Sequence, residues 1–352
     1  MKRVTLVLLI VMAMFSGCSL ILKVPEMGKV INEDVVVKSP ALKYSLLDSL
    51  HEIYVANELS PEKWKDYYSD ADPSGKKHYD WLIKTYSEMS DSMKKTLSYN
   101  FERVHLWKLM NMSTELTDEA DVNDIVNFYR SSWFDLPPLV RIKLIQLLPE
   151  FYDEHFKKYF DINQESFTTL ASSMTEEAIE YPNPFEFMEE LTGIDLPGEY
   201  SCMFYYTFRK VGAFGFTYGS IKISTLQRNV DDISKLFFTP LHEYGHDYFQ
   251  TFTKKSDFKE LAEDLKENDI SFYEYWNNDE SLKQSYSWAG FCEENLVEGF
   301  AKFLREEYYG KTDHKENYYY DLDFYEYLKE IEFNPDEISL KEASFSFYEE
   351  VM

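Results

Sequence analysis

The stretch Leu241-His242-Glu243-Tyr244-Gly245-His246-Asp247 contains the pattern H-E-x-x-H. On a helix, residues i and i+4 lie on one face, so His242 and His246 can direct two imidazole nitrogens at one metal ion. Glu243 comes directly after the first histidine, within reach of a water molecule beside that metal. Two neutral histidine ligands, an open coordination position and an adjacent carboxylate base are the arrangement of a zinc hydrolase.

Apolar residues flank the motif on both sides. They are Leu236, Phe237, Phe238, Leu241, Tyr248 and Phe249. A polar group inside an apolar stretch is expected to be partly buried, and buried polar groups need partners. The flanks therefore favour a metal site over two surface histidines on an ordinary amphipathic helix.

Zinc needs a third protein ligand, and the segment 292–301 provides candidates for it. Glu294 and Glu298 are spaced i and i+4 on an expected helix, so they share a face. One can bind the metal, and the other can accept the ring N–H of a ligand histidine. Glu293 lies about 100° away around the helix, so we expect it to be less able to share this work.

With these two motifs, the sequence resembles the gluzincins, zinc metallopeptidases in which H-E-x-x-H is followed by a glutamate on a second helix. The form E-x-x-x-E-x-F-A, from Glu294 to Ala301, is similar to the lethal-factor type. The resemblance covers roughly residues 200–308. It implies that Glu294 is the third ligand and that Glu298 contacts a ligand histidine.

The same resemblance implies two further features. Lethal-factor-type enzymes have a tyrosine shortly before the glutamate ligand, and Tyr286 stands at a comparable position as a donor to the oxyanion. Zincins also have a strand that pairs with extended substrate, and residues 212–224 are placed to supply it. An ordinary sheet strand is the alternative for this segment.

Composition limits the partners of the chain. Its 352 residues carry a net charge of -27, which excludes binding to nucleic acid through the phosphates. Hydrophobic residues make up 44%, enough for a substantial core. Cys202 and Cys292 have no zinc-type C-x-x-C neighbour, and the sequence leaves open whether they form a disulfide or are two buried thiols.

Residues 1–17 have the pattern of a targeting segment. A charged start is followed by an apolar run that is too short to span a bilayer permanently. The run ends in Phe15-Ser16-Gly17-Cys18, which resembles the bacterial lipobox, so we expect a lipid on Cys18. The alternative is a secretory signal with an incidental cysteine. Ser19 replaces the aspartate that resembles an inner-membrane retention signal, which favours the outer membrane if the cell has one.

The remaining chain divides by pattern. Residues 18–40 are predicted to be the lipidated cysteine and a tether, and residues 41–165 a helical region. Residues 166–352 are predicted to be a zincin-like catalytic domain with a small antiparallel sheet near residues 200–224. The expected fold class is α+β and predominantly helical.

These observations predict a lipid-anchored, extracytoplasmic zinc metallopeptidase acting on a peptide or protein substrate. His242, His246 and Glu294 would hold Zn²⁺, and Glu243 would serve as general base toward a zinc-activated water. Two alternatives stay open. One is a non-catalytic surface-binding lipoprotein on a zincin fold, and the other is a zinc amidase acting on a non-peptide amide.

Overall fold

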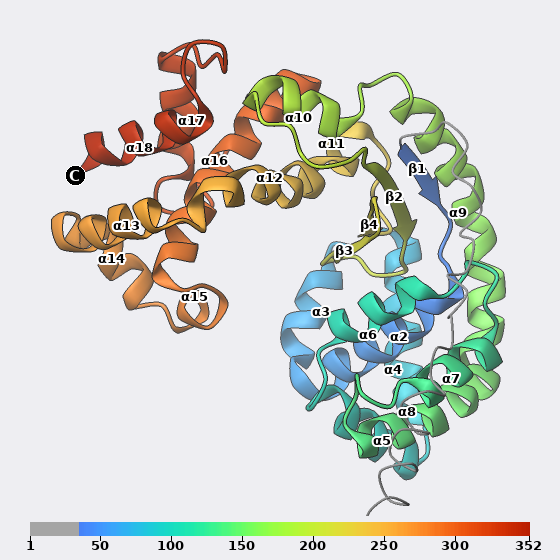
Figure 1. The fold of residues 1–352 in the computed structure, drawn as a ribbon. Helices are drawn as coiled ribbons and strands as arrows, with labels where there is room; N and C mark the ends of the chain where they lie inside the picture. Colours follow the sequence, from blue (N-terminus) through green and yellow to red (C-terminus); the bar gives the residue numbers. More distant parts are fainter. Residues whose placement is uncertain (1–34) are drawn as a thin grey trace, which may run out of the picture.

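The computed structural model describes residues 35–352, which are helical apart from one four-stranded sheet (Figure 1). The strands are β1 (Val35–Lys38), β2 (Ser201–Tyr206), β3 (Gly215–Tyr218) and β4 (Ile221–Leu226). The predominantly helical α+β class predicted from the sequence is therefore confirmed. The targeting segment and Cys18 lie outside the described residues.

The sheet is mixed, with the strand order β1-β2-β4-β3. β1, β2 and β4 run parallel, and only β3 is antiparallel, paired with β4 across a tight turn at Gly219. The prediction of an antiparallel sheet was thus wrong for all pairs except β3–β4. Residue patterns identify strands, but packing sets the order of the strands in the sheet. Here β4 lies between β2 and β3, so β2 pairs with β4 and not with β3, which follows it in the sequence.

β1 was also missed, because it lies in the segment predicted as a tether. Its residues Val35 and Val37 are buried. The run is only four residues long, and a strand this short is recognisable only from its partner. That partner is β2, with Val35 opposite Cys202.

The N-terminal half contains mainly short helices that pack around the sheet. In Figure 1 those of residues 42–151 lie below the sheet, the helix of residues 157–178 runs beside β1, and the helix of residues 184–192 lies above the sheet. These helices are α2 (Leu42–Tyr54), α3 (Pro61–Ser69), α4 (Pro73–Glu88), α5 (Asp91–Phe101), α6 (Leu106–Met112), α7 (Val122–Ser131), α8 (Pro138–Phe151), α9 (Lys157–Ala178) and α10 (Pro184–Thr192). Two π-helical turns (Val55–Leu59, Tyr152–Phe156) and a 3₁₀ turn (Ser113–Glu115) complete this part. The boundary predicted at residue 165 falls inside α9, which packs along β1.

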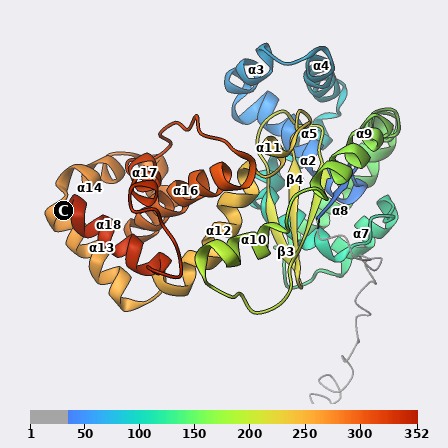
Figure 2. The ribbon, with the colours of Figure 1, turned by 90° about the horizontal axis from the view of Figure 1, so that it is seen from above.

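The C-terminal half is built on two long helices that lie side by side, α12 (Phe238–Thr253) and α16 (Trp288–Tyr309). α12 runs from the sheet toward the C-terminal helices (Figures 1 and 2). The other helices are α11 (Ile233–Leu236), α13 (Ser256–Asn268), α14 (Ile270–Asn277), α15 (Glu280–Ser285), α17 (Asp321–Glu330) and α18 (Leu340–Val351).

Two open questions from the sequence are answered by the described residues. Cys202 and Cys292 are both buried, and they form no disulfide. Among residues 35–352, no helix combines the length and the apolar character needed to cross a bilayer.

Candidate metal centre

The motif helix α12 presents its two histidines on one face, as the spacing predicts. Pro240 lies in the first turn, where its missing N–H is not needed. Tyr244 and Tyr248 are buried on the opposite side of the motif, which fixes the rotation of the helix. His242 and His246 are half-buried, with ring centroids 5.1 Å apart.

Glu294 of α16 lies between the two imidazoles. Its Oε1 is 3.1 Å from Nε2 of His242, and its Oε2 is 3.4 Å from Nε2 of His246. One ligand atom from each of the three residues lies within 4.8 Å of the others. The structure therefore brings together the three residues that the sequence predicted as metal ligands.

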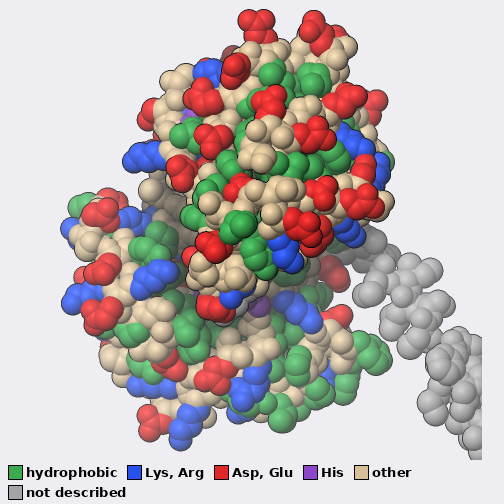
Figure 3. Space-filling view, turned by 90° about the vertical axis from the view of Figure 1, so that its left-hand side faces the viewer, with side chains coloured by type: hydrophobic (Ala, Val, Ile, Leu, Met, Phe, Trp, Pro, Cys, Tyr) green, Lys and Arg blue, Asp and Glu red, His purple; other side chains and the backbone are tan. Residues whose placement is uncertain are grey.

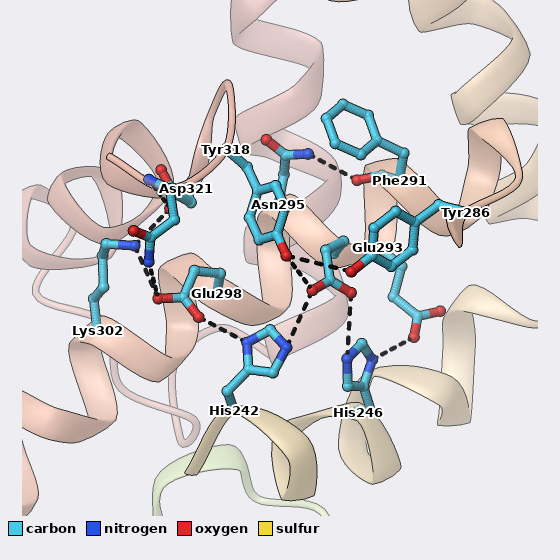
Figure 4. A network of polar contacts seen from close by, with 12 residues as sticks. His242, His246, Tyr286, Phe291, Glu293, Asn295, Glu298, Lys302, Tyr318 and Asp321 are labelled. Atoms are coloured by element: carbon cyan, nitrogen blue, oxygen red, sulfur yellow. Dashed lines mark hydrogen bonds and ion pairs between the residues drawn. The ribbon is translucent and has the colours of Figure 1, made fainter. Parts of the chain in front are cut away.

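The other ring nitrogen of each histidine faces a second carboxylate, in an ion pair for His242 and in a hydrogen bond for His246 (Figure 4). Nδ1 of His242 is 2.7 Å from Oε2 of Glu298, the contact predicted for that residue. Nδ1 of His246 donates to Oε1 of Glu293 at 2.9 Å. A carboxylate at Nδ1 fixes the tautomer of an imidazole so that Nε2 is left for a metal.

The contact made by Glu293 corrects the sequence argument, which gave this residue a lesser part. The helical-wheel argument considered α16 alone, whereas α12 crosses it and brings a different turn opposite each glutamate. Beyond His246, α12 offers Gln250 and Thr253 to the same carboxylate. Thr253 donates to Oε2 of Glu293 at 2.6 Å. Gln250 and Thr253, four and seven residues after His246, were the only indication in the sequence that a carboxylate would lie beside this part of α12.

The histidines and carboxylates of the cluster shift each other's protonation. Burial alone would lower the pKa of His242, but the contacts with Glu294 and Glu298 raise it to about 9. The pKa of His246 is raised to about 10, against burial, by Glu293 and Glu294. Burial would raise the pKa of Glu294, but both histidines lower it to about 2. Burial would also raise the pKa values of Glu293 and Glu298, but His246 and Thr253 lower that of Glu293, and His242 and Arg305 lower that of Glu298.

No family model, curated protein or solved structure matches this chain. The character of the site is therefore argued from its own residues. Two imidazole nitrogens and one carboxylate oxygen are the donor set of catalytic zinc sites, which keep a further position open. The donor chemistry and the held Nδ1 atoms fit such a metal.

Glu243 is exposed and lies where two cavities meet. One cavity, of about 410 Å³, is enclosed by the β3–β4 hairpin, α11, the start of α12 and Lys311. The other, of about 450 Å³, is more open and is lined by both histidines, Tyr286, Glu293 and Glu294. Glu243 thus borders both the cavity beside the β3–β4 hairpin and the metal centre.

Tyr286 borders the site, but a second tyrosine that the sequence did not indicate lies closer to the predicted ligand. Tyr318 donates to Oε1 of Glu294 at 2.9 Å, and its hydroxyl is 3.3 Å from that of Tyr286. Burial raises the pKa of both phenols, and Glu294 adds to this effect, so both remain donors at neutral pH. The chain has 28 tyrosines, and no spacing rule connects Tyr318 with the motif.

The segment predicted to border a cleft contains β3, which is an edge strand of the sheet. Gly215 accepts a hydrogen bond on its carbonyl from Nε1 of Trp107 at 2.9 Å, so that carbonyl points away from β4. Backbone groups alternate along a strand, so those of the exposed Thr217 point the same way. The edge is therefore partly covered and partly free.

Proposed function

We propose that this protein is a zinc-dependent peptidase of the gluzincin type. The observation that carries the proposal is the pair of imidazoles whose Nε2 atoms converge on Glu294 while their Nδ1 atoms are held by Glu298 and Glu293. A zinc ion bound by His242, His246 and Glu294 would lower the pKa of a bound water and polarise a substrate carbonyl.

The chain's own residues supply the proton transfer. Glu243 follows the first ligand and borders both cavities, so it can accept a proton from the attacking water and pass it to the leaving amine. Tyr286 lines the same cavity as both histidines and Glu294, and its hydroxyl contacts that of Tyr318, so these phenols can donate to negative charge on the carbonyl oxygen.

The shape of the surface suits an extended chain. Figure 3 shows a hollow between the C-terminal helices above and the N-terminal helices below. The free part of β3 can pair with an extended peptide, and the adjacent 410 Å³ cavity can take one of its side chains. Leu226, Val230 and Leu236 are buried in the lining of this cavity, which favours an apolar side chain.

The metal is the first point to test. The purified domain should bind about one zinc per chain, as three protein ligands predict. His246→Ala should lose the metal, because it removes one of the three protein ligands. Elemental analysis after dialysis measures this. Full zinc occupancy in both His242→Ala and His246→Ala would contradict the site.

The carboxylates of α16 should separate into two classes. Glu294→Ala should abolish zinc binding, because its carboxylate faces both Nε2 atoms. Glu298→Ala and Glu293→Ala should each weaken it by about 10- to 100-fold, as expected for residues that orient a ligand histidine. A chelator competition titration gives the three affinities. Retention of zinc by Glu294→Ala, with loss in Glu298→Ala, would exchange the roles of these two residues.

The proposal includes a lipid anchor on Cys18, outside the described residues. Cys18→Ser should prevent incorporation of labelled fatty acid and release the protein from the membrane fraction, because the thiol is the attachment point. Absence of label from the wild-type protein would remove the anchor and leave a secreted enzyme.

A further inference from the structure

Glu298 accepts hydrogen bonds from three donors on the same carboxylate oxygen, Oε1. Lys302 donates to Oε1 at 3.1 Å, Arg305 at 2.8 Å, and the side-chain amide of Asn317 at 2.8 Å. The other oxygen, Oε2, is left to face Nδ1 of His242. The direction of the free oxygen is therefore determined by these three contacts.

Asn317 comes from the segment Asn317–Asp321, here called the strap, which returns to α16 after the helix has ended. Asp321 accepts from Lys302 at 2.6 Å and from the backbone N–H of Asn317 at 2.8 Å. Together with Glu298, these residues form a closed ring of contacts (Figure 4). The strap is also held by the backbone N–H of Tyr320, which donates to Asn295 at 2.7 Å.

The residue after Glu298 is a glycine, and the strap requires it. A β-carbon at Gly299 would lie 2.6 Å from the carbonyl oxygen of Asp321 and 3.0 Å from Cβ of Phe324. Any other residue would push the start of α17 away from α16. The close approach places the strap beside Glu298.

The same network reaches the motif helix. Arg305 donates to the carbonyl of Phe238, the first residue of α12, through Nε at 3.1 Å and Nη2 at 2.7 Å. Glu298, Lys302, Arg305 and Asp321 are all nearly inaccessible to solvent and carry two charges of each sign. A buried network of this kind is stable only when every member is paired.

We propose that the strap is a positioning element of the metal centre: Asn317 and Asp321 fix Glu298, and Glu298 fixes the ring of His242. Tyr318, in the same strap, contacts Glu294, so one segment reaches the carboxylates beside both ring nitrogens of His242. This inference rests on the proposed function and adds that affinity for the metal depends on a segment that supplies no ligand.

The test uses a substitution that keeps the shape of the strap but removes its donor. Asn317→Asp has the same shape, but it replaces the amide donor with a carboxylate that would face Oε1 of Glu298 as a like charge. Residue 317 is exposed, so the protein should still fold. It should weaken zinc binding by about tenfold, the lower end of the range for residues that orient a ligand. Gly299→Ala, which displaces the strap without removing a polar group, should weaken it in the same direction. Glu316→Gln, the opposite exchange at the neighbouring exposed residue, is the control and should leave the affinity unchanged.

Two readouts separate positioning from simple stability. Zinc affinity is measured by chelator competition, and ¹⁵N-resolved NMR of the histidine rings in the zinc-loaded protein reports the tautomer of His242. We expect Asn317→Asp to lower the affinity and to broaden or shift the His242 ring signals, while circular dichroism shows that the metal-free protein remains folded. Wild-type affinity and ring signals in Asn317→Asp would overturn the role of the strap alone. A wild-type protein that binds no zinc would overturn the proposed function and, with it, this role.

Discussion

Glu243→Gln is expected to lower the turnover of a cleavable peptide by about 10²-fold or more while leaving the zinc content and the fold unchanged. Glutamine keeps the size and the hydrogen-bonding capacity of the side chain but cannot accept a proton. Glu243 is exposed at the junction of the two cavities, so its replacement opens no hole in the core. The variant should still bind peptide and can be used to capture the natural substrate.

The matched control is Asp247→Asn, the same acid-to-amide exchange one turn further along α12. Asp247 forms an ion pair with Lys222 of β4 at 2.6 Å, away from Glu294. The turnover of the Asp247→Asn variant should remain within about twofold of wild type, because a partly exposed ion pair contributes little to stability. If wild type and Glu243→Gln are equally inert on a broad peptide library while both hold zinc, a binding role on the same metal centre becomes the better explanation.

The part of the site that could be predicted is the part set by local geometry. The i, i+4 spacing of His242 and His246 places both rings on one face of any helix. The same spacing in Glu294 and Glu298 gave one residue beside Nε2 and one beside Nδ1 of His242. These relations depend only on helical periodicity and on the ligand preferences of zinc.

The part that could not be predicted depends on how separate segments cross. Glu293 contacts His246 because α12 packs against α16, and an argument from one helix alone does not contain that packing. Tyr318 and Asn317 reach the site because the chain folds back after α16. β1 likewise depends on pairing with β2, more than 150 residues later in the chain. The parallel pairing of β2 with β4 joins residues about 20 positions apart.

The N-terminal helices are joined to the sheet by a second buried network, far from the motif in sequence. Arg209, just after β2, contacts Asp48 of α2 through Nε at 3.1 Å and through Nη2 at 2.5 Å. One turn along α2, Glu52 contacts Nε2 of His78 at 2.9 Å and accepts from Tyr68 at 3.0 Å. These groups are almost completely buried. The segment that leads into β3 is therefore fixed to α2 by charge.

Arg209→Met should reduce the free energy of unfolding by about 3–5 kcal/mol, because it leaves the carboxylate of Asp48 buried without its cation. Burial raises the pKa of Asp48 to about 7 even though Arg209 opposes the shift. Urea denaturation of the two proteins measures the difference. Lys210→Met is the neighbouring control: Lys210 pairs with the exposed Asp70, so its loss should change the stability little.

The double variant Asp48→Leu with Arg209→Met distinguishes the cost of an unpaired charge from the loss of a stabilising pair. Replacing both partners by apolar residues of similar volume removes the buried charge, and such exchanges are often neutral or stabilising. The double variant should therefore recover most of the stability that Arg209→Met loses. If it is as unstable as the sum of its two single variants, Arg209 acts through packing against its other neighbours, such as the ring of Phe214, over which its guanidinium lies at 5.1 Å. Recovery would instead show that the cost of Arg209→Met comes from leaving the carboxylate of Asp48 buried without a partner.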